Sequence, residues 1–444
     1  MQRLYENLFY SKPVNELFED ESFIKHMLRF EAALAKAQAE QGLIPDAAAK
    51  LIGTCCRIEN IRIELLIEQI ALGGNVNIPF IKQLTQAVAI KDVEAAKYIH
   101  FGATSQDVMD TATVLQLRDA LTMMANDLDL LIKQLIGIMN AHRNTMMIGR
   151  SFKQHARPIT FGFKVAKWLD ALLRSRKHIA GLLQNNLVLQ LGGAVGTLSS
   201  MEDKGLKIAE AVGKILDLKV PAIPWHSQRD RFAEIATTLG ILQGNIGKLA
   251  EDVNLLMQTE ISEVSEPSLA GKGGSSSMPH KRNPVGCIAI SANSKRMPAL
   301  VSTMLNGLNG DHERATGHWH AEWETLATIV KLAAGSARQA VVITNGLEVD
   351  TNQMRINLEL TKGLIYAENI SLTLTKHIGK SKAEELVEKS CREAKQQGIH
   401  LKELIKKNPE VMKYLSPDNI EELFDPKNSI GLCNDFINRV LNLV

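Results

Sequence analysis

The sequence predicts an all-α fold built around a central bundle of long helices. Two apolar seams carry this prediction, because their residues recur at alternating steps of three and four, the spacing of one helix face. The seam residues are Val114, Leu117, Leu121, Met124, Leu128, Leu131, Leu135 and Ile138, and then Ile235, Leu239, Leu242, Ile246, Leu249, Val253 and Leu256. Proline is absent from 80–157 and from 299–408, which permits long helices there. No alternating strand pattern of useful length accompanies the seams.

Three domains are expected along the 444 residues. They are an N-terminal helical domain at 1–110, a central long-helix bundle at 111–349 and a C-terminal helical domain at 350–444. A chain of this length buries large cores and divides into two or three domains. Thr111 and Thr351 are the helix caps expected near the two junctions. The seams by themselves indicate core packing and do not establish an oligomer.

Composition excludes several classes of function. The chain has 51 Lys and Arg residues against 49 Asp and Glu residues, so its net charge of +2 gives no general attraction to nucleic acid or to acidic membranes. Neither a run of about eighteen apolar residues nor a secretory signal is visible, and we expect a cytoplasmic protein without a membrane partner. The five cysteines form no Cys-x-x-Cys pair, which favours free thiols over disulfides or metal ligands.

The run Gly271–Pro284, GKGGSSSMPHKRNP, is the most informative stretch of the chain. Its glycines predict a loop that lets the backbone approach a ligand closely. Its three serines, two lysines, arginine and histidine supply hydrogen-bond donors and positive charge. This combination suits a substrate rich in carboxylates.

The same run resembles the signature GSSxMPxKxNP of the fumarase/aspartase superfamily. The matching residues are Gly274, Ser275, Ser276, Met278, Pro279, Lys281, Asn283 and Pro284. The resemblance implies a three-domain fold of the fumarase/aspartase type, whose central bundle tetramerises so that three subunits build each active site. It implies neither a metal nor a cofactor.

Two further segments resemble superfamily motifs. His100–Asp107, followed by Asp110 and Thr111, would place Thr104 and Ser105 at a helix start, where hydroxyl and N–H groups bind carboxylates. An ordinary Ser/Thr cap is the alternative interpretation.

Gly149–Gly162 resembles the pattern GRTHxQxAxPxTxG, but Phe152 stands where the histidine is expected. In most superfamily members that histidine pairs with a glutamate after the signature loop, and here Ala289 occupies the glutamate position. Loss of both partners together is physically consistent, because a buried glutamate without its histidine would be an unpaired charge.

This double replacement resembles the bacterial 3-carboxy-cis,cis-muconate cycloisomerases within the superfamily. The resemblance extends to Gln190–Gly196, Gln228–Arg231 and Gly317–Trp323. It implies conversion of 3-carboxy-cis,cis-muconate to 4-carboxymuconolactone, a step of protocatechuate degradation in the β-ketoadipate pathway. In such a reaction an ionised substrate carboxylate adds to its own conjugated double bond, so the enzyme needs no base for the nucleophile and no acid for a leaving group.

The resemblance also implies roles for particular residues. Ser275 is the expected proton donor, with Ser276 as the neighbouring candidate, and Lys281 is expected to stabilise the serine alkoxide. The residues expected to bind the small tricarboxylate substrate are Thr104, Ser105, Arg150, Gln154, His155, Arg229, His280, Arg282 and Asn283. For His155, a structural histidine on a bundle helix is an equally open interpretation. Trp319 and Trp323 are expected to pack rather than to form a pocket wall.

Two other functions stay open at this point. One is an adenylosuccinate lyase-like enzyme that releases fumarate and has its acid elsewhere, although the Arg-His-Asp triplet of those lyases is replaced here by Gly73–Pro79. The other is a catalytically silent structural protein on the same scaffold. The presence of Ser275, Lys281 and Asn283 argues against the silent protein.

Overall fold

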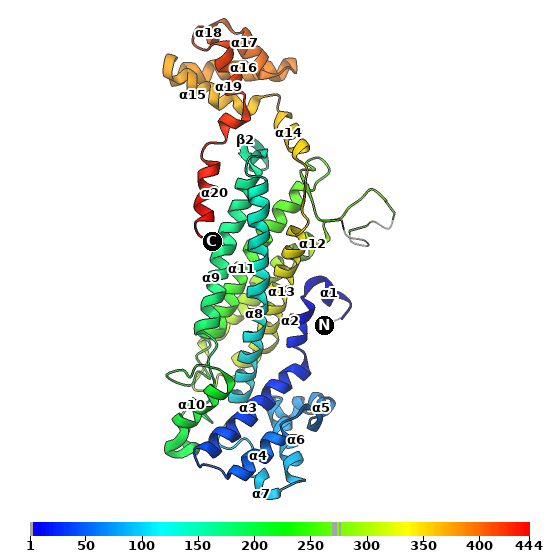
Figure 1. Ribbon diagram of the computed structural model, residues 1–444, viewed down its shortest axis with the longest axis vertical. Helices are drawn as coiled ribbons and strands as arrows, with labels where there is room; N and C mark the ends of the chain where they lie inside the picture. Colours follow the sequence, from blue (N-terminus) through cyan, green and yellow to red (C-terminus); the bar gives the residue numbers. More distant parts are fainter. Residues whose placement is uncertain (1–2, 269–272, 275–276) are drawn as a thin grey trace. The chain divides into compact units, whose positions relative to one another are not determined.

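α-Helices form most of the chain in the computed structural model, which describes residues 3–268, 273–274 and 277–444 (Figure 1). The α-helices are α1 (Glu6–Phe9), α2 (Lys12–Leu17), α3 (Asp20–Glu40), α4 (Asp46–Cys55), α5 (Ile63–Gly73), α6 (Asn77–Ala89), α7 (Val93–Ala96), α8 (Ser105–Ala141), α9 (Phe161–Asn185), α10 (Gly205–Leu216), α11 (Asp230–Leu256), α12 (Val285–Asn306), α13 (His318–Thr344), α14 (Thr351–Glu359), α15 (Ala367–Ile378), α16 (Lys380–Gln397), α17 (Leu401–Lys407), α18 (Pro409–Met412), α19 (Pro417–Leu423) and α20 (Cys433–Leu441). The four short strands are β1 (Met146–Ser151), β2 (Gln154–Thr160), β3 (Val264–Ser265) and β4 (Glu348–Val349).

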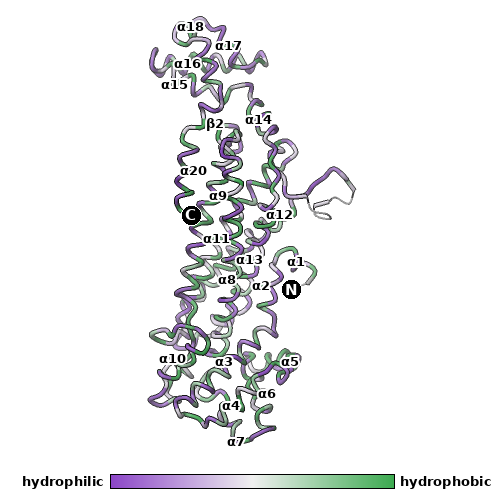
Figure 2. Tube along the Cα trace, viewed as in Figure 1, coloured by the Kyte–Doolittle hydropathy of each residue, from purple (hydrophilic) through white to green (hydrophobic). Residues whose placement is uncertain are grey.

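Both apolar seams lie on helices, as the sequence predicts. The first runs along α8 and the second along α11. Their residues are buried, with Ile138 as the half-buried exception. Figure 2 shows how hydrophobic and hydrophilic residues intersperse along these helices.

The chain forms two compact units, each assembled from three segments of sequence. Unit 1 comprises Met1–Leu128, Ser175–Gly244 and Ala289–Gln339, and unit 2 comprises Asp129–Arg174, Asn245–Ile288 and Ala340–Val444. The division falls inside α8, α9, α11, α12 and α13, so each of these helices contributes to both units. The three sequence domains therefore stay a prediction.

Unit 1 contains the N-terminal helices and one part of each long helix. Within it α3 packs against α4 and α10, and α6 packs against α5 and α7. The side-chain amide of Asn293 on α12 donates to the carbonyl of Phe9 and to Ser336 Oγ on α13, which ties the N-terminal segment to two long helices. The motif-like segment that contains Thr104 and Ser105 belongs to this unit.

Unit 2 contains a β-hairpin, a second antiparallel pair of strands and the C-terminal helices. β1 pairs with β2, and β3 pairs with β4. The C-terminal helices α15 to α19 lie together, drawn in orange and red in Figure 1. Their core centres on residues such as Tyr366, Ile370 and Leu374, and Ile148 of β1 joins it.

Helix α13 is long and apolar enough, by length and composition alone, to cross a membrane, and 67% of its apolar window is buried. That burial is typical of a core helix. None of the five cysteines forms a disulfide.

The two predicted helix caps are wrong. Thr111 lies inside α8, where its buried hydroxyl donates to the carbonyl of Gln190. Thr351 is the first residue of α14, and the cap is Asp350, whose carboxylate accepts from the Gln353 N–H.

Candidate active site

The start of α8 forms the first part of the candidate site. Helix α8 begins at Ser105, directly after Thr104, which confirms the predicted helix start. The Thr104 N–H donates to Asp107 Oδ2 at 3.0 Å. Arg314 Nη1 donates to Thr104 Oγ1 at 2.8 Å, so a guanidinium stands beside the hydroxyl expected to bind a carboxylate. Arg314 was not among the residues that the sequence predicted for the site.

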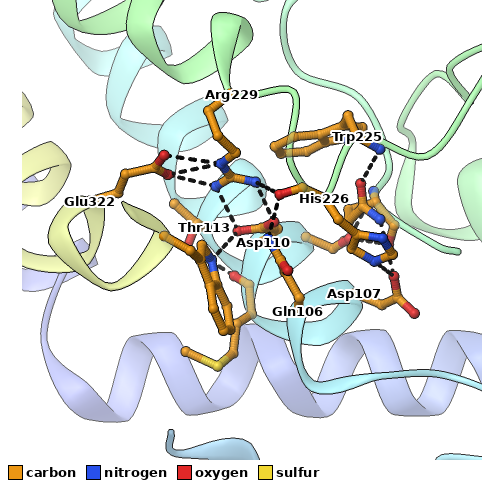
Figure 3. Close-up of polar contacts among 12 residues, drawn as sticks. Gln106, Asp107, Asp110, Thr113, Trp225, His226, Arg229 and Glu322 are labelled. Atoms are coloured by element: carbon orange, nitrogen blue, oxygen red, sulfur yellow. Dashed lines mark hydrogen bonds and ion pairs between the residues drawn. The ribbon is translucent and has the colours of Figure 1, made fainter. Parts of the chain in front are cut away.

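The Asp107 side chain fixes this helix start in place. It is fully buried, and its two oxygens contact five polar groups from three segments of unit 1. These groups are Thr104 N, Gly192 N, Gly193 N, Gln190 Nε2 and His226 Nε2, at 2.7 to 3.1 Å. The carboxylate therefore joins the α8 N-terminus to the loop that contains Gly192 and Gly193, and Figure 3 shows Asp107 beside His226.

Glycine is required at position 192 in that loop. A Cβ there would lie 2.7 Å from the Cβ of Pro224 and 2.8 Å from the His226 ring, too close for a side chain. The close approach lets the backbone N–H groups reach Asp107. This explains physically why the run Gln190–Gly196 has consecutive glycines.

Arg229 lies buried between two carboxylates, as Figure 3 shows. Its Nη1 and Nη2 donate to Asp110 at 2.6 and 3.0 Å, and its Nε and Nη2 donate to Glu322 at 3.0 and 2.7 Å. Burial would lower the pKa of the guanidinium, but the two carboxylates raise it above its usual value. Burial also raises the pKa of Glu322, and Arg229 opposes that rise. Since all three of its nitrogens are engaged, Arg229 could contact substrate only by giving up one of these bonds.

The two tryptophans of the run Gly317–Trp323 pack, as expected, and also line a cavity. Their rings meet edge to face at 5.0 Å, and Trp319 Nε1 donates to Asp110 Oδ1 at 3.0 Å. Both border a cavity of about 530 Å³ within unit 1. The described residues include no group of three or more His, Cys, Asp or Glu side chains arranged to hold a metal ion.

The second segment is a β-hairpin, which corrects the expectation of a purely helical chain. Arg150 on β1 and His155 on β2 are cross-strand neighbours, so His155 does not lie on a bundle helix. The turn between the strands contains Phe152 and Lys153 at φ of +49° and +64°. The usual turn residues for such angles are Asn and Gly, which is why the sequence did not reveal the hairpin.

The hairpin residues differ in what they contact. Arg150 makes a bidentate ion pair with Glu263, whose side chain is fully buried, at 3.0 and 2.7 Å. Gln154 is exposed, and His155 is half-buried with an Nδ1 that has no hydrogen-bond partner among the described residues. Burial, and then the nearby Arg150, lower the pKa of His155. Phe152 is 99% exposed at the hairpin tip.

Hydrogen bonds and an ion pair hold the described part of the signature loop near its two ends. Asn283 N–H donates to the Gly273 carbonyl at 2.8 Å, and Arg282 donates to Glu348 at 2.9 and 3.1 Å and to the Glu266 carbonyl at 2.6 Å. Hydrogen bonding with Glu348 raises the pKa of Arg282, and the same contact lowers the pKa of Glu348. His280 and Lys281 are exposed, and Asn283 is half-buried. Ser275 and Ser276, the expected catalytic serines, lie outside the described residues.

Glu266 also anchors the helix that follows the loop. Its buried carboxylate accepts from the N–H groups of Gly286 and Cys287 at 3.2 and 2.7 Å, in the first turn of α12. A carboxylate at a helix N-terminus is stabilised by the free N–H groups there. Ala289, one turn further along α12, is buried and apolar.

The expected site residues divide between the two units. Thr104, Ser105 and Arg229 belong to unit 1. The others belong to unit 2: Arg150, Gln154, His155, His280, Lys281, Arg282 and Asn283. Within each unit the structure places the residues of one segment near one another. Their roles in substrate binding stay predictions.

Comparison with known proteins identifies the family. Residues 10–298 match the family described as "Lyase", and residues 363–440 match "Adenylosuccinate lyase C-terminus". The chain is 43% identical over 443 residues to the 3-carboxy-cis,cis-muconate cycloisomerase of Acinetobacter baylyi, covering 99% of this chain and 98% of that protein. It is 44% identical over 439 residues to the protein of the same name from Pseudomonas aeruginosa, covering 99% and 96%.

A solved structure agrees with these matches. The 3-carboxy-cis,cis-muconate lactonizing enzyme from Pseudomonas putida superposes with a TM-score of 0.95 at 42% sequence identity, covering 100% of this chain and 99% of that chain. In sequence and in fold, the chain therefore belongs to the lyase family of the fumarase/aspartase superfamily, together with the 3-carboxy-cis,cis-muconate cycloisomerases.

Proposed function

We propose that this protein is a 3-carboxy-cis,cis-muconate cycloisomerase that forms 4-carboxymuconolactone in the protocatechuate branch of the β-ketoadipate pathway. The relatives of this name match along nearly the whole chain. The observation that carries the proposal in the chain itself is the pair of positions 152 and 289. Phenylalanine and alanine there supply neither the acid nor the carboxylate that a fumarate-releasing lyase needs.

The chemistry requires little acid–base help. A substrate carboxylate oxygen forms the new C–O bond, and the electron pair of the double bond moves onto a second carboxylate as an enediolate. Lys281 and Asn283 hold that carboxylate, and Ser275 delivers one proton to the α carbon. The resulting alkoxide, stabilised by Lys281, is reprotonated by solvent, so one proton is taken up and no group is lost.

Substrate binding uses the segments already described. Thr104 and Ser105 would bind a further carboxylate at the α8 N-terminus, where the helix dipole favours an anion. Arg314 donates to Thr104 Oγ1 and adds positive charge at that place. Arg150, Gln154 and His155 would approach from the hairpin, while His280 and Arg282 would contribute to the field that attracts a tricarboxylate.

A cytoplasmic homotetramer with shared active sites is the assembly we propose. Phe152 supports it, because a fully exposed aromatic side chain at a hairpin tip gains most when another chain covers it. Light scattering on the full chain tests the mass of the assembly. Mixing and refolding two inactive variants, Thr104→Ala and Ser275→Ala, should restore activity if different subunits contribute these residues to one site.

Turnover of 3-carboxymuconate is the direct test of the activity. The purified protein should remove the diene absorbance of 3-carboxymuconate and leave adenylosuccinate unchanged. Cleavage of adenylosuccinate would instead support the fumarate-releasing alternative.

Ser275→Ala should lower kcat by about 10²–10⁴-fold, the usual contribution of a positioned acid or base, while the assembly survives. Ser277→Ala, in the same run of serines, is the matched control and should keep normal turnover. Near-normal turnover of Ser275→Ala together with a collapse in Ser276→Ala would transfer the role to Ser276.

A further inference from the structure

A second imidazole–carboxylate pair lies close to the start of α8. His100 is the first residue of the segment that leads into Thr104, and its Nδ1 lies 2.7 Å from Oε1 of Glu31 on α3. The Glu31 side chain is 1% exposed and that of His100 is 16% exposed. The pair is therefore nearly removed from water, where a charge-assisted hydrogen bond is strong.

The backbone of His100 is strained at this position. Its φ of +55° lies in the left-handed region, which non-glycine residues adopt rarely. The next residue is held as well, because Gln38 Nε2 on α3 donates to the Phe101 carbonyl at 2.6 Å. Helix α3 thus holds the chain at two successive residues, four and three positions before Thr104.

The second ring nitrogen of His100 faces Asn77 at the start of α6. His100 Nε2 lies 3.4 Å from Asn77 Nδ2, and Asn77 Oδ1 is buried with no hydrogen-bond partner among the described residues. In this arrangement Nε2 accepts from the amide, as a neutral imidazole does. Protonation of Nε2 would reverse the direction of this hydrogen bond, because the protonated Nε2 donates and the Asn77 amide would then turn its unpartnered oxygen toward the ring.

The charged groups around His100 favour its protonated form. Burial opposes the charge, but the charge of Glu31, its hydrogen bond and the charge of Asp107 on α8 together raise the pKa of His100 above its usual 6.5. Asn77 on α6 is neutral. The Cys56 thiol at the end of α4 is also neutral near pH 7, since burial and the charge of Glu31 raise its pKa well above its usual range.

We propose that His100, held by Glu31, is a positioning residue that sets the Thr104–Ser105 turn for a substrate carboxylate and strengthens its binding when the imidazole is protonated. The inference rests on the proposed function, because the carboxylate bound at this turn is that of the tricarboxylate substrate. It assigns a role to His100, which takes no part in the proposed reaction steps. The role is one of affinity, so it changes KM more than kcat.

The test compares two variants with a matched control on the full-length assembled protein. His100→Asn removes the titrating group but tolerates a positive φ, and Glu31→Gln keeps the shape of the pair while removing its charge. His400→Asn is the control: His400 contacts Glu359 at 3.2 Å in unit 2, and it caps α17, a position that asparagine also suits.

The wild-type KM for 3-carboxymuconate should rise as pH increases through the raised pKa of His100. Glu31→Gln should move that inflection to lower pH and raise KM at least fivefold at pH 7.5, with kcat changed less than twofold. His100→Asn should abolish the inflection, and His400→Asn should retain it. An unmoved inflection in Glu31→Gln, or a kcat loss of orders of magnitude with unchanged KM in His100→Asn, would overturn the proposal.

A binding measurement separates this inference from the proposed activity. Tricarballylate, a saturated tricarboxylate, should raise the melting temperature of the wild-type protein more at pH 6 than at pH 8, and this difference should vanish in His100→Asn. Failure of the wild type to turn over 3-carboxymuconate would refute the proposed function. Equal tricarballylate protection at both pH values in the wild type would refute the role of His100.

Discussion

Replacement of Arg229 by methionine should destabilise the protein strongly. The substitution removes a fully buried cation but leaves Asp110 and Glu322, whose side chains are 3% and 4% exposed. Breaking a buried ion pair by removing one partner costs about 3–5 kcal/mol, because the remaining charge is uncompensated. The stacking of the guanidinium on the Trp225 and Phe232 rings, each 4.9 Å away, is lost as well. The free energy of unfolding of a domain is about 5–15 kcal/mol, so this loss is a large fraction of the total.

The pH dependence of this variant follows from the same charges. Without Arg229, the main opposition to the effect of burial on Glu322 is lost and only the charge of His318 still lowers its pKa, so that pKa rises further above the usual 4.5. A carboxyl group whose folded pKa is raised binds a proton more tightly when folded, so it destabilises the protein above that pKa and not below 4.5. The deficit of the variant should therefore be larger at pH 8 than at pH 5.

Urea unfolding at fixed protein concentration and at both pH values measures these effects. The matched control is Arg392→Met, which breaks a pair with Glu388 at 3.3 Å whose side chains are 66% and 67% exposed and which should change little. The triple variant Arg229→Met, Asp110→Asn, Glu322→Gln should recover part of the loss, because no charge of this buried cluster remains. If Arg229→Met unfolded at the same urea concentration as Arg392→Met at pH 8, the account of a buried charge cluster would be refuted.

Two further predictions concern packing and the missing acid–base pair. Gly335→Ala should destabilise the protein by about 1–3 kcal/mol despite the better helix propensity of alanine, because the new Cβ would lie 2.0 Å from the Phe9 carbonyl oxygen. Gly181→Ala has open space around it and should stabilise the protein by about 0.5–1 kcal/mol. A higher melting temperature for Gly335→Ala than for Gly181→Ala would contradict both expectations. The double variant Phe152→His, Ala289→Glu should not release fumarate from adenylosuccinate at an efficient rate, because the rest of the pocket still suits a tricarboxylate. Efficient release in a coupled fumarate assay would mean that these two positions alone decide the reaction.

The long helices were predictable because their information is local. The seam residues of α8 and α11 recur at alternating steps of three and four, and this spacing indicates one helix face without reference to distant residues. The hairpin of β1 and β2 was not predictable in this way. Its strands are short, and Phe152 and Lys153 adopt a turn that their residue types disfavour. Tertiary contacts such as that of Arg150 with the buried Glu263 hold the hairpin in place.

The sequence predicted which segments contribute to the site. It did not predict the tertiary contacts that support those segments. The motifs placed Thr104 and Ser105 at a helix start, and the structure agrees. No pattern in the sequence indicated that Asp110 and Glu322 would surround Arg229, because these residues are far apart along the chain. Arg314 lies in a polar loop between α12 and α13, and only the fold brings it to Thr104.

The replacements at positions 152 and 289 and the retained groups elsewhere have a common physical explanation. An elimination needs an acid aimed at its leaving group, whereas internal addition of a carboxylate discards nothing. Selection on such a reaction can therefore drop the imidazole–carboxylate pair aimed at the leaving group but must keep the groups that hold carboxylates. The His100–Glu31 pair belongs to the second class, because it supports the Thr104–Ser105 turn from within unit 1. An imidazole can thus keep a role in substrate affinity through the charge it places near an anion, even where no step needs an imidazole to transfer a proton.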